Sequence, residues 1–357
     1  MSSEDRDLEL AILTRRLLSA EGYYTELKVP VFLQFYGSTF RRSTATDVDV
    51  LGIRFDLDMT PTVAVVEAKS GEDKALEELL KLRAVAEYVR AARMYFVKTR
   101  VHGNAREVGR SLGIVSASKG ELTQMLRGLG IDDGDPYEEE RKSFTQQKEW
   151  LASMRRIRGM RHLANYIEAE AWSRSYWENV HNLMYFISGF LEHSRGKPPI
   201  WAEFVVLRAV AALSVSVLHL CRQIMLSSLA DVSGGVGTFV FGGAAARRQR
   251  ERLRDEILKI LPSLDGMTIP IEPQFLDGLK ELVAYLLLSP VASTKTPLVF
   301  QEAIDIVAVG GGRFDATKWS GGHDPVSIKL AKDILQFAVG GFGVTGPIEN
   351  LSAFLAL

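Results

Sequence analysis

The chain has 357 residues, of which 46% are hydrophobic and 24% charged, with 43 Lys and Arg against 44 Asp and Glu. Its length allows two domains with separate cores, and its near-neutral balance excludes a uniformly basic nucleic-acid-binding protein, so any such surface must be a local cluster of Lys and Arg. The one cysteine, Cys221, excludes a disulfide within the chain and favours a reducing cytoplasm.

The first elements are a helix and a strand. Apolar residues at helical spacing predict a helix from Asp7 to Ala20, which Gly22 ends. Residues 23–33 are typical of an extended strand, in which Pro30 favours an edge position or a bend. The polar stretch from residue 35 to 46 predicts a loop or a ragged strand end.

Two further strands follow, and they carry three charged side chains. Residues 47–55 and 63–69 alternate with the period of two that defines a strand, and both faces are largely apolar, which favours central strands. A hairpin centred near residue 58 places Glu67 roughly opposite Asp49, with Lys69 on the same face. Charges in an apolar sheet are costly unless something binds them. Asp47 is a competing acid two residues before Asp49.

Helices and strands continue to alternate as far as residue 128. The predicted elements are a helix ending near Val89, a strand at 94–98, a short helix opened by a capping box at 104–107 and closed by Gly113, a strand at 114–117, and a helix that starts at a capping box at 118–121 and ends near Gly128. This order predicts an α/β domain with a mixed sheet between helices.

An acidic segment, residues 130–140, marks the predicted boundary between a domain of residues 1–135 and a mainly α-helical domain of residues 136–357. The predicted helices cover about 138–160, 162–193, 200–230, 244–261, 273–288 and 325–339. Glycine-rich segments such as 233–243 are predicted as turns and linkers, and none has the form of a nucleotide-binding loop. Charged residues interrupt the apolar stretch from 201 to 229, which favours a buried helix over a membrane span.

Asp49 followed by Glu67-Ala68-Lys69 resembles the PD-(D/E)XK, or restriction-endonuclease-like, superfamily. The resemblance covers roughly the first third of the chain: helix, strand, Asp-bearing strand, Glu-x-Lys strand, helix, strand, with the local sequences Asp-Val-Asp-Val-Leu-Gly and Val-Val-Glu-Ala-Lys-Ser. No Pro precedes Asp49. The resemblance implies a restriction endonuclease-like sheet and a helix-borne acid completing the site. Glu9 is the candidate for that acid, and an exposed surface Glu is the alternative.

The chemistry of these side chains supports a metal site. Two carboxylates about 4 Å apart repel by about 4 kcal/mol at an effective dielectric of about 20, and a divalent ion removes that repulsion. We expect Mg²⁺, with Mn²⁺ as a substitute, on Asp49, Glu67 and the carbonyl of Ala68, with Lys69 orienting the attacking water. The alternative is a structural ion pair between Lys69 and Asp49 or Glu67 in a domain without activity.

Other residues are candidates for nucleic-acid contact. They are Arg41 and Arg42 in the polar loop, Ser70 beside the motif, and Arg155, Arg156 and Arg158 in a basic run. A solvated loop and a helix cap are the alternatives for the first three. A second basic run, residues 247–254, is interleaved with acidic residues, which favours a solvated helix face.

The first hypothesis is therefore a cytoplasmic, Mg²⁺-dependent endonuclease that hydrolyses DNA phosphodiester bonds, with no membrane association. The resemblance implies roles in restriction, antiphage defence, recombination or repair. The helical domain would serve a homodimer or larger oligomer, target selection, or a protein partner. The second hypothesis is a catalytically inactive module of the same fold that binds nucleic acid or protein. A third is a nuclease that becomes active only on assembly with a partner.

Overall fold

The computed structural model describes residues 2–34, 42–71, 74–131, 137–196, 198–227, 229–260, 271–340 and 351–357, with the backbone alone at 32–34, 42–45 and 352. The chain forms two compact units. The sheet unit comprises Met1–Asp56, Pro61–Ser173 and Gln301–Trp319, and the helical unit comprises Leu57–Thr60, Arg174–Phe300 and Ser320–Leu357.

The sheet unit holds five strands in the order β1-β2-β3-β4-β5, which are Tyr24–Gln34, Arg42–Phe55, Pro61–Lys69, Arg93–Lys98 and Val115–Ser118. β1, β2 and β3 pair antiparallel, whereas β3, β4 and β5 pair parallel. The helices of this unit are α1 (Ser3–Ala20), α2 (Ala75–Tyr88), α3 (Gly103–Ser111), α4 (Lys119–Gly128), α5 (Tyr137–Arg156) and α6 (Arg161–Glu168), with short 3-10 turns η1 (Glu170–Trp172) and η3 (Ala316–Lys318). The predicted mixed sheet between helices is confirmed.

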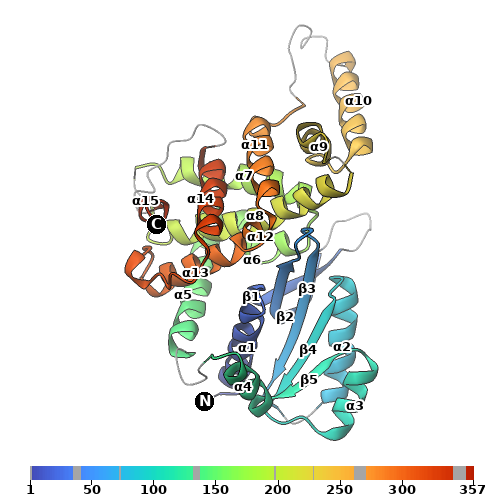
Figure 1. Ribbon diagram of the computed structural model, residues 1–357, viewed down its shortest axis with the longest axis vertical. Helices are drawn as coiled ribbons and strands as arrows, with labels where there is room; N and C mark the ends of the chain where they lie inside the picture. Colours follow the sequence, from blue (N-terminus) through green and yellow to red (C-terminus); the bar gives the residue numbers. More distant parts are fainter. Residues whose placement is uncertain are drawn as a thin grey trace. The chain divides into compact units, whose positions relative to one another are not determined.

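Helices α1 and α4 lie on one side of the sheet and α2 and α3 on the other (Figure 1), and apolar side chains pack between each pair of helices and the sheet. Residues of α1 and α4 pack with Val50, Val66 and Val97, and we call this layer the α1-side core. Residues of α2 and α3 pack with Val65 and Phe96, and we call this layer the α2-side core. The sheet is therefore covered on both faces, as mixed and parallel sheets require.

The β2–β3 hairpin has the register that the sequence predicts. Its ladder runs from Phe55 opposite Pro61 to Val50 opposite Val66, so the next rung is Asp49 and Glu67. The capping box at Ser118 is also confirmed, because the Ser118 Oγ accepts the Glu121 N–H and the Glu121 carboxylate accepts the Ser118 N–H.

Other sequence predictions were wrong. The capping box expected at 104–107 does not form, because α3 begins at Gly103 with His102 as an N-cap that makes no side-chain hydrogen bond. The single helix expected over 162–193 is broken into α6, η1 and α7 (Tyr176–His193), since Ser175 and Glu178 form a new capping box. By contrast, the strand end that was one of two alternatives for the polar stretch from residue 35 to 46 is confirmed, because β2 begins at Arg42.

The helical unit contains α7, α8 (Ala202–Ser227), α9 (Val232–Phe239), α10 (Ala244–Ile260), α11 (Leu276–Leu288), α12 (Pro290–Ser293), the start of α13 (Thr296–Val309), α14 (Pro325–Gly340) and α15 (Leu351–Leu355). The segment 233–243, predicted as a turn or linker, includes most of α9. Asp231 caps this helix, because its side chain accepts the Gly234 N–H. The sequence did not predict α12 or α13.

Helix α8 is the core of the helical unit. Among the described residues it is the one single helix long and apolar enough to cross a membrane, and α11 with Pro290–Val309 passes the same test as a bent pair. In α8, 94% of the apolar window is buried inside the protein. The predicted buried helix is confirmed.

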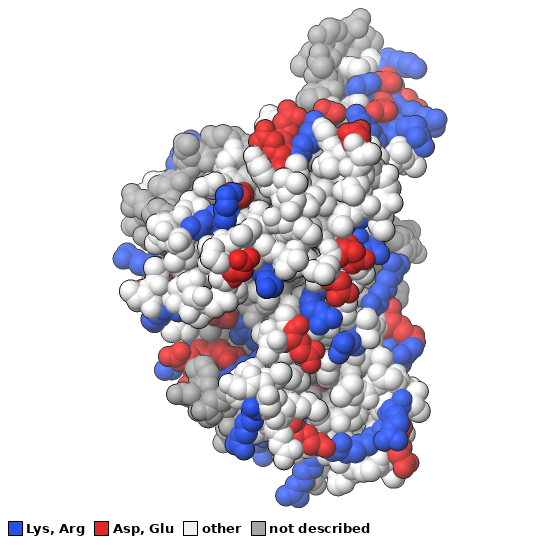
Figure 2. All heavy atoms as spheres, viewed as in Figure 1, with Lys and Arg blue, Asp and Glu red and all other residues white. Residues whose placement is uncertain are grey.

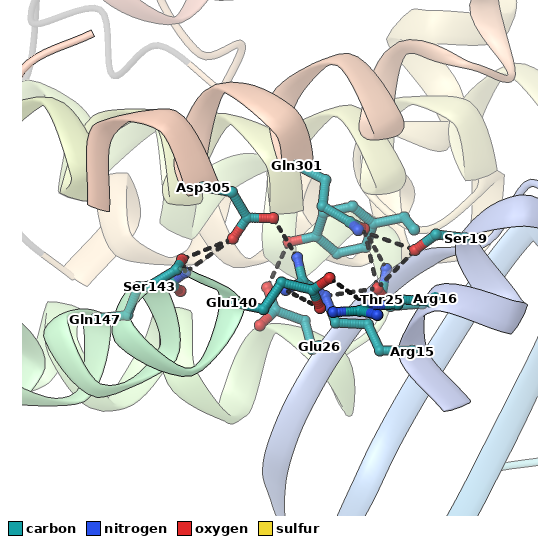
Figure 3. Close-up of polar contacts among 11 residues, drawn as sticks. Arg15, Arg16, Ser19, Thr25, Glu26, Glu140, Ser143, Gln147, Gln301 and Asp305 are labelled. Carbon is teal, nitrogen blue, oxygen red and sulfur yellow. Dashed lines mark hydrogen bonds and ion pairs between the residues drawn. The ribbon is translucent and has the colours of Figure 1, made fainter. Parts of the chain in front are cut away.

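A buried polar network completes the sheet unit with segments from far along the chain (Figure 3). Arg15 of α1 pairs with Asp305 of α13, and Arg16 Nε donates to Glu140 Oε1 of α5 at 2.6 Å. The Thr25 N–H donates to Gln301 Oε1 at 2.7 Å. Burial would lower the pKa of Arg15, but the carboxylates of Asp305 and Glu140 raise it. Because buried charges must be paired, α5 and α13 are integral to this unit, which extends past the boundary predicted near residue 135.

Replacing Asp305 with Ala should lower the free energy of unfolding by about 2 kcal/mol or more, because the buried Arg15 guanidinium loses its nearest carboxylate. Asp333→Ala is the matched control: its side chain is 25% exposed, against 28% for Asp305, but its partner Lys329 is 69% exposed. We expect that control to lose less than about 1 kcal/mol. Urea denaturation measures both, and equal losses would contradict the role given to the network.

Candidate functional site

Asp49, in the middle of β2, meets Glu67 and Lys69 at the end of β3. The Asp49 and Glu67 residues are only 1% and 4% exposed, whereas the Lys69 side chain is 27% exposed. Lys69 Nζ lies 3.2 Å from Asp49 Oδ2 and 3.0 Å from Glu67 Oε1. The three predicted side chains therefore converge, with the ammonium at the solvent side of two buried carboxylates.

Asp49 is held at both oxygens. Its Oδ2 accepts the Ala68 N–H at 2.7 Å, and its Oδ1 forms an ion pair with Lys28 Nζ of β1. The sequence analysis missed Lys28; its place in an apolar strand, paired antiparallel with the strand of Asp49, is the signal that could have found it. Asp47 is exposed, so Asp49 is the acid that belongs to the site.

Glu67 is the electrostatically strained member of the site. Burial raises its pKa, the neighbouring Asp49 raises it further, and Lys69 opposes both. Lys81 Nζ of α2 lies 3.9 Å from Glu67 Oε1, and that oxygen is buried without an aligned hydrogen bond. Burial would lower the pKa of Lys69, but the carboxylates of Asp49 and Glu67 raise it, so Lys69 is an ammonium at neutral pH.

A second buried ion pair adjoins the first. Lys98 of β4 is the sheet partner of Lys69, and its Nζ lies 3.9 Å from Glu78 Oε2 of α2. Both atoms are buried, and neither has a hydrogen-bond partner in the described part of the chain. Burial raises the pKa of Glu78 although Lys98 and Lys69 lower it. The sequence analysis missed this pair too, although Lys98 ends an otherwise apolar strand.

Glu9, the candidate acid on the first helix, contacts α4, and a second acid of the same helix contacts the residue that follows β3. Glu9 forms an ion pair with Lys119 of α4, at 2.7 Å. Asp7, two residues earlier, accepts the Ser70 N–H at 2.5 Å, directly after Lys69. The Ser70 side chain donates to the Ser3 carbonyl at 3.3 Å and does not cap α2, whose N-cap is Lys74.

The candidate nucleic-acid contacts lie in three separate segments of the chain. Arg41 lies outside the described residues, and the Arg42 side chain is not described. Arg155 forms an ion pair with Glu168, and burial lowers its pKa. Arg156 and Arg158 are exposed, and with Arg155, Arg161 and His162 they line a hollow at the turn between α5 and α6.

The second basic run lies on α10 and is a solvated helix face. No residue of this helix is buried, and Arg247 pairs with Glu251 at 3.2 Å. On the face seen in Figure 2, basic and acidic side chains are interspersed rather than gathered in one basic patch. The solvated helix face predicted for residues 247–254 is confirmed.

The donor set fits a hard divalent cation with few protein ligands. In the ranges described above, no group of three or more His, Cys, Asp or Glu residues could hold a metal ion. Asp49 and Glu67 supply two carboxylates, and the buried Glu67 Oε1 has no aligned hydrogen bond. Mg²⁺ takes one or two protein carboxylates and keeps several waters, so this pair is chemically adequate for it.

Comparisons with protein-family models, with curated proteins and with solved structures found no match. The function is therefore argued from the geometry of the site.

In metal-free buffer at pH 7.5, Glu67→Gln should make the protein more stable than the wild type. The folded-state pKa of Glu67 lies above its ordinary value of 4.5, so the ionised carboxylate destabilises the fold at neutral pH. That penalty disappears as the pH falls through the raised pKa toward 4.5, and the difference between the two proteins should shrink over the same range.

Chemical denaturation at a series of pH values measures this difference. Glu77→Gln, on a side chain that is 72% exposed, is the control and should follow the wild type. A Glu67→Gln variant less stable than the wild type at pH 7.5 would show that the ion pairs with Lys69 and Lys81 outweigh burial and repulsion.

Proposed function

We propose that this chain is a metal-dependent nuclease of the PD-(D/E)XK type that hydrolyses phosphodiester bonds in DNA. The observation that carries the proposal is the convergence of Asp49, Glu67 and Lys69 on adjacent central strands of a mixed sheet. The helix before the sheet and the parallel β4 after β3 are the arrangement that the resemblance implies. The near-complete burial of both carboxylates supports a cation-binding role, because two neighbouring buried carboxylates are stable only with positive charge beside them.

Asp49, Glu67 and the carbonyl of Ala68 would hold Mg²⁺, for which Mn²⁺ would substitute. When bound, the metal supplies Lewis-acid activation of a water and of the phosphate. Lys69, charged and partly exposed, would orient the attacking water and offset the negative charge that develops on the phosphorus. For the acid carried by the first helix we propose Asp7 in place of Glu9, because the Asp7 carboxylate lies at the end of β3.

The DNA backbone would contact Arg156 and Arg158, whose side chains are exposed beside the hollow between α5 and α6. The helical unit would serve oligomerisation, target selection or a protein partner. Cytoplasmic roles in restriction, antiphage defence, recombination or repair would all use the same hydrolysis.

A second candidate function is a noncatalytic module that binds nucleic acid or protein. Lysines on both sides of Asp49 favour it, because Lys28 and Lys69 already neutralise that carboxylate. The same ion pairs would hold the sheet together without any metal.

Asp49→Asn, Glu67→Gln and Lys69→Ala should each lower the rate of DNA cleavage by about 100-fold or more, because each removes a group from the reacting centre. The measurement is the rate of cleavage of plasmid and linear DNA in Mg²⁺ or Mn²⁺, with RNA as a second substrate. Lys329→Ala, on a side chain that is 69% exposed, is the control.

Equal rates in all these proteins, or no cleavage in any, would favour the noncatalytic module. Cleavage that starts only after a protein partner is added would instead identify a nuclease activated by assembly. The same assay separates the two candidate acids of α1: Asp7→Asn should slow cleavage, whereas Glu9→Gln should not.

Replacing Arg156 and Arg158 together with Ala should weaken DNA binding and reduce the salt dependence of the binding constant by about 2 in the log–log slope, since two phosphate contacts are lost. Binding is measured in the Asp49→Asn background, where cleavage does not interfere. The matched control replaces Arg248 and Arg252, two exposed arginines of α10, and removes the same charge. Identical losses in both pairs would mean that net charge alone governs binding.

A further inference from the structure

Near Lys28, the alternation of side chains between the two faces of the sheet is interrupted in β1 and β2. The φ of Lys28 is +52°, a left-handed backbone conformation that residues other than glycine rarely adopt within a strand. Residues two apart in a strand ordinarily share a face, yet Leu27 packs in the α1-side core and Val29 in the α2-side core. Across the ladder, Val50 and Val48 divide between the same two cores. The local irregularity thus flanks Lys28 in β1 and Asp49 in β2.

The irregular backbone places an ammonium on the buried carboxylate. Lys28 Nζ pairs with Asp49 Oδ1, while Lys69 Nζ donates to Oδ2 at 3.2 Å. Both lysine side chains are 27% exposed, so each ammonium has a route to solvent. The Lys28 carbonyl accepts from Lys148 Nζ of α5 at 3.4 Å, and Lys148 pairs with Glu168 of α6 at 3.0 Å. Strained backbone conformations cluster at functional sites, so the conformation of Lys28 points to a role in this site.

Three ammonium groups lie close to the carboxylates of Asp49 and Glu67. Asp49 and Glu67 face three ammonium groups, those of Lys28, Lys69 and Lys81. Lys69 lies between both carboxylates, whereas Lys28 approaches Asp49 from the opposite strand. A divalent cation on Asp49 would compete with Lys28 for the carboxylate and would repel its ammonium.

We propose that Lys28 is an internal counter-ion that neutralises Asp49 in the metal-free protein and leaves the carboxylate when a divalent metal binds. Lys28 then sets the metal affinity of the site and keeps it closed at low metal concentration. This inference rests on the metal site of the proposed function, but not on DNA hydrolysis. The strained conformation of Lys28 would serve to hold its ammonium on the carboxylate of Asp49, for which the metal competes.

The test is a Mn²⁺ titration of metal-stripped wild-type, Lys28→Met and Lys28→Arg proteins, followed by electron paramagnetic resonance or calorimetry at one fixed pH. Met keeps the side-chain stem and removes the charge, so Lys28→Met should bind Mn²⁺ with a Kd about tenfold lower or more, and tenfold corresponds to about 1.4 kcal/mol. Arg keeps the charge and should bind close to the wild type. Lys74→Met, on a side chain that is 70% exposed, is the control and should not change the Kd.

Unchanged or weaker Mn²⁺ binding by a folded Lys28→Met variant would overturn the inference, as would the absence of Mn²⁺ binding in every variant. If Lys28→Met does not fold, Lys28→Gln is judged by the same criterion. DNA cleavage at saturating Mn²⁺ is recorded on the same samples. Tighter Mn²⁺ binding by Lys28→Met without cleavage by any protein would support the counter-ion and show that the chain alone is not an active nuclease. Cleavage with equal Mn²⁺ affinities would support the nuclease and overturn the counter-ion.

Discussion

The buried carboxylate of Asp49 is the constraint on which the geometry of the sheet depends. A charge that is 1% exposed in an apolar sheet is strongly unfavourable unless partners surround it. Its partners come from the strands on either side, Lys28 from β1 and the Ala68 N–H and Lys69 from β3. A slip of β2 by one residue would move Asp49 away from all of them, so the same contacts that neutralise the charge also fix the register of three strands.

The two acids of the site have different environments. Asp49 accepts a backbone hydrogen bond and lies between two lysines, whereas Glu67 has a raised pKa and an oxygen without an aligned hydrogen bond. One carboxylate is thus fixed in position, and the other gains most from an added positive charge. This difference suits the proposed metal site, in which one carboxylate would keep its position without a ligand and the other would gain from a bound cation.

The hairpin and its register were predictable because they depend on local information: a period of two, a polar turn, and two acids equally far from its centre. Features that do not follow from a local sequence pattern were not predicted. Asp7 and Glu9 are two residues apart, which is about 200° around a helix, so only one of them reaches β3, and the apolar pattern does not say which. Lys28 was missed because the left-handed residue interrupts the alternation on which strand prediction relies. The pairing of Arg15 with Asp305 spans nearly the whole chain, and no local pattern encodes it.

The return of Gln301–Trp319 to the sheet unit has a consequence for how the protein is made. Asp305 leaves the ribosome 290 residues after its partner Arg15, when most of the helical unit has been synthesised. At about 5–20 residues per second, the interval lasts roughly 15 to 60 seconds. During that time Arg15 of the nascent sheet unit lacks the carboxylate of Asp305, whereas Glu140, the partner of Arg16, is made well before Asp305. Completion of the sheet unit is therefore coupled to the emergence of residues 301–319.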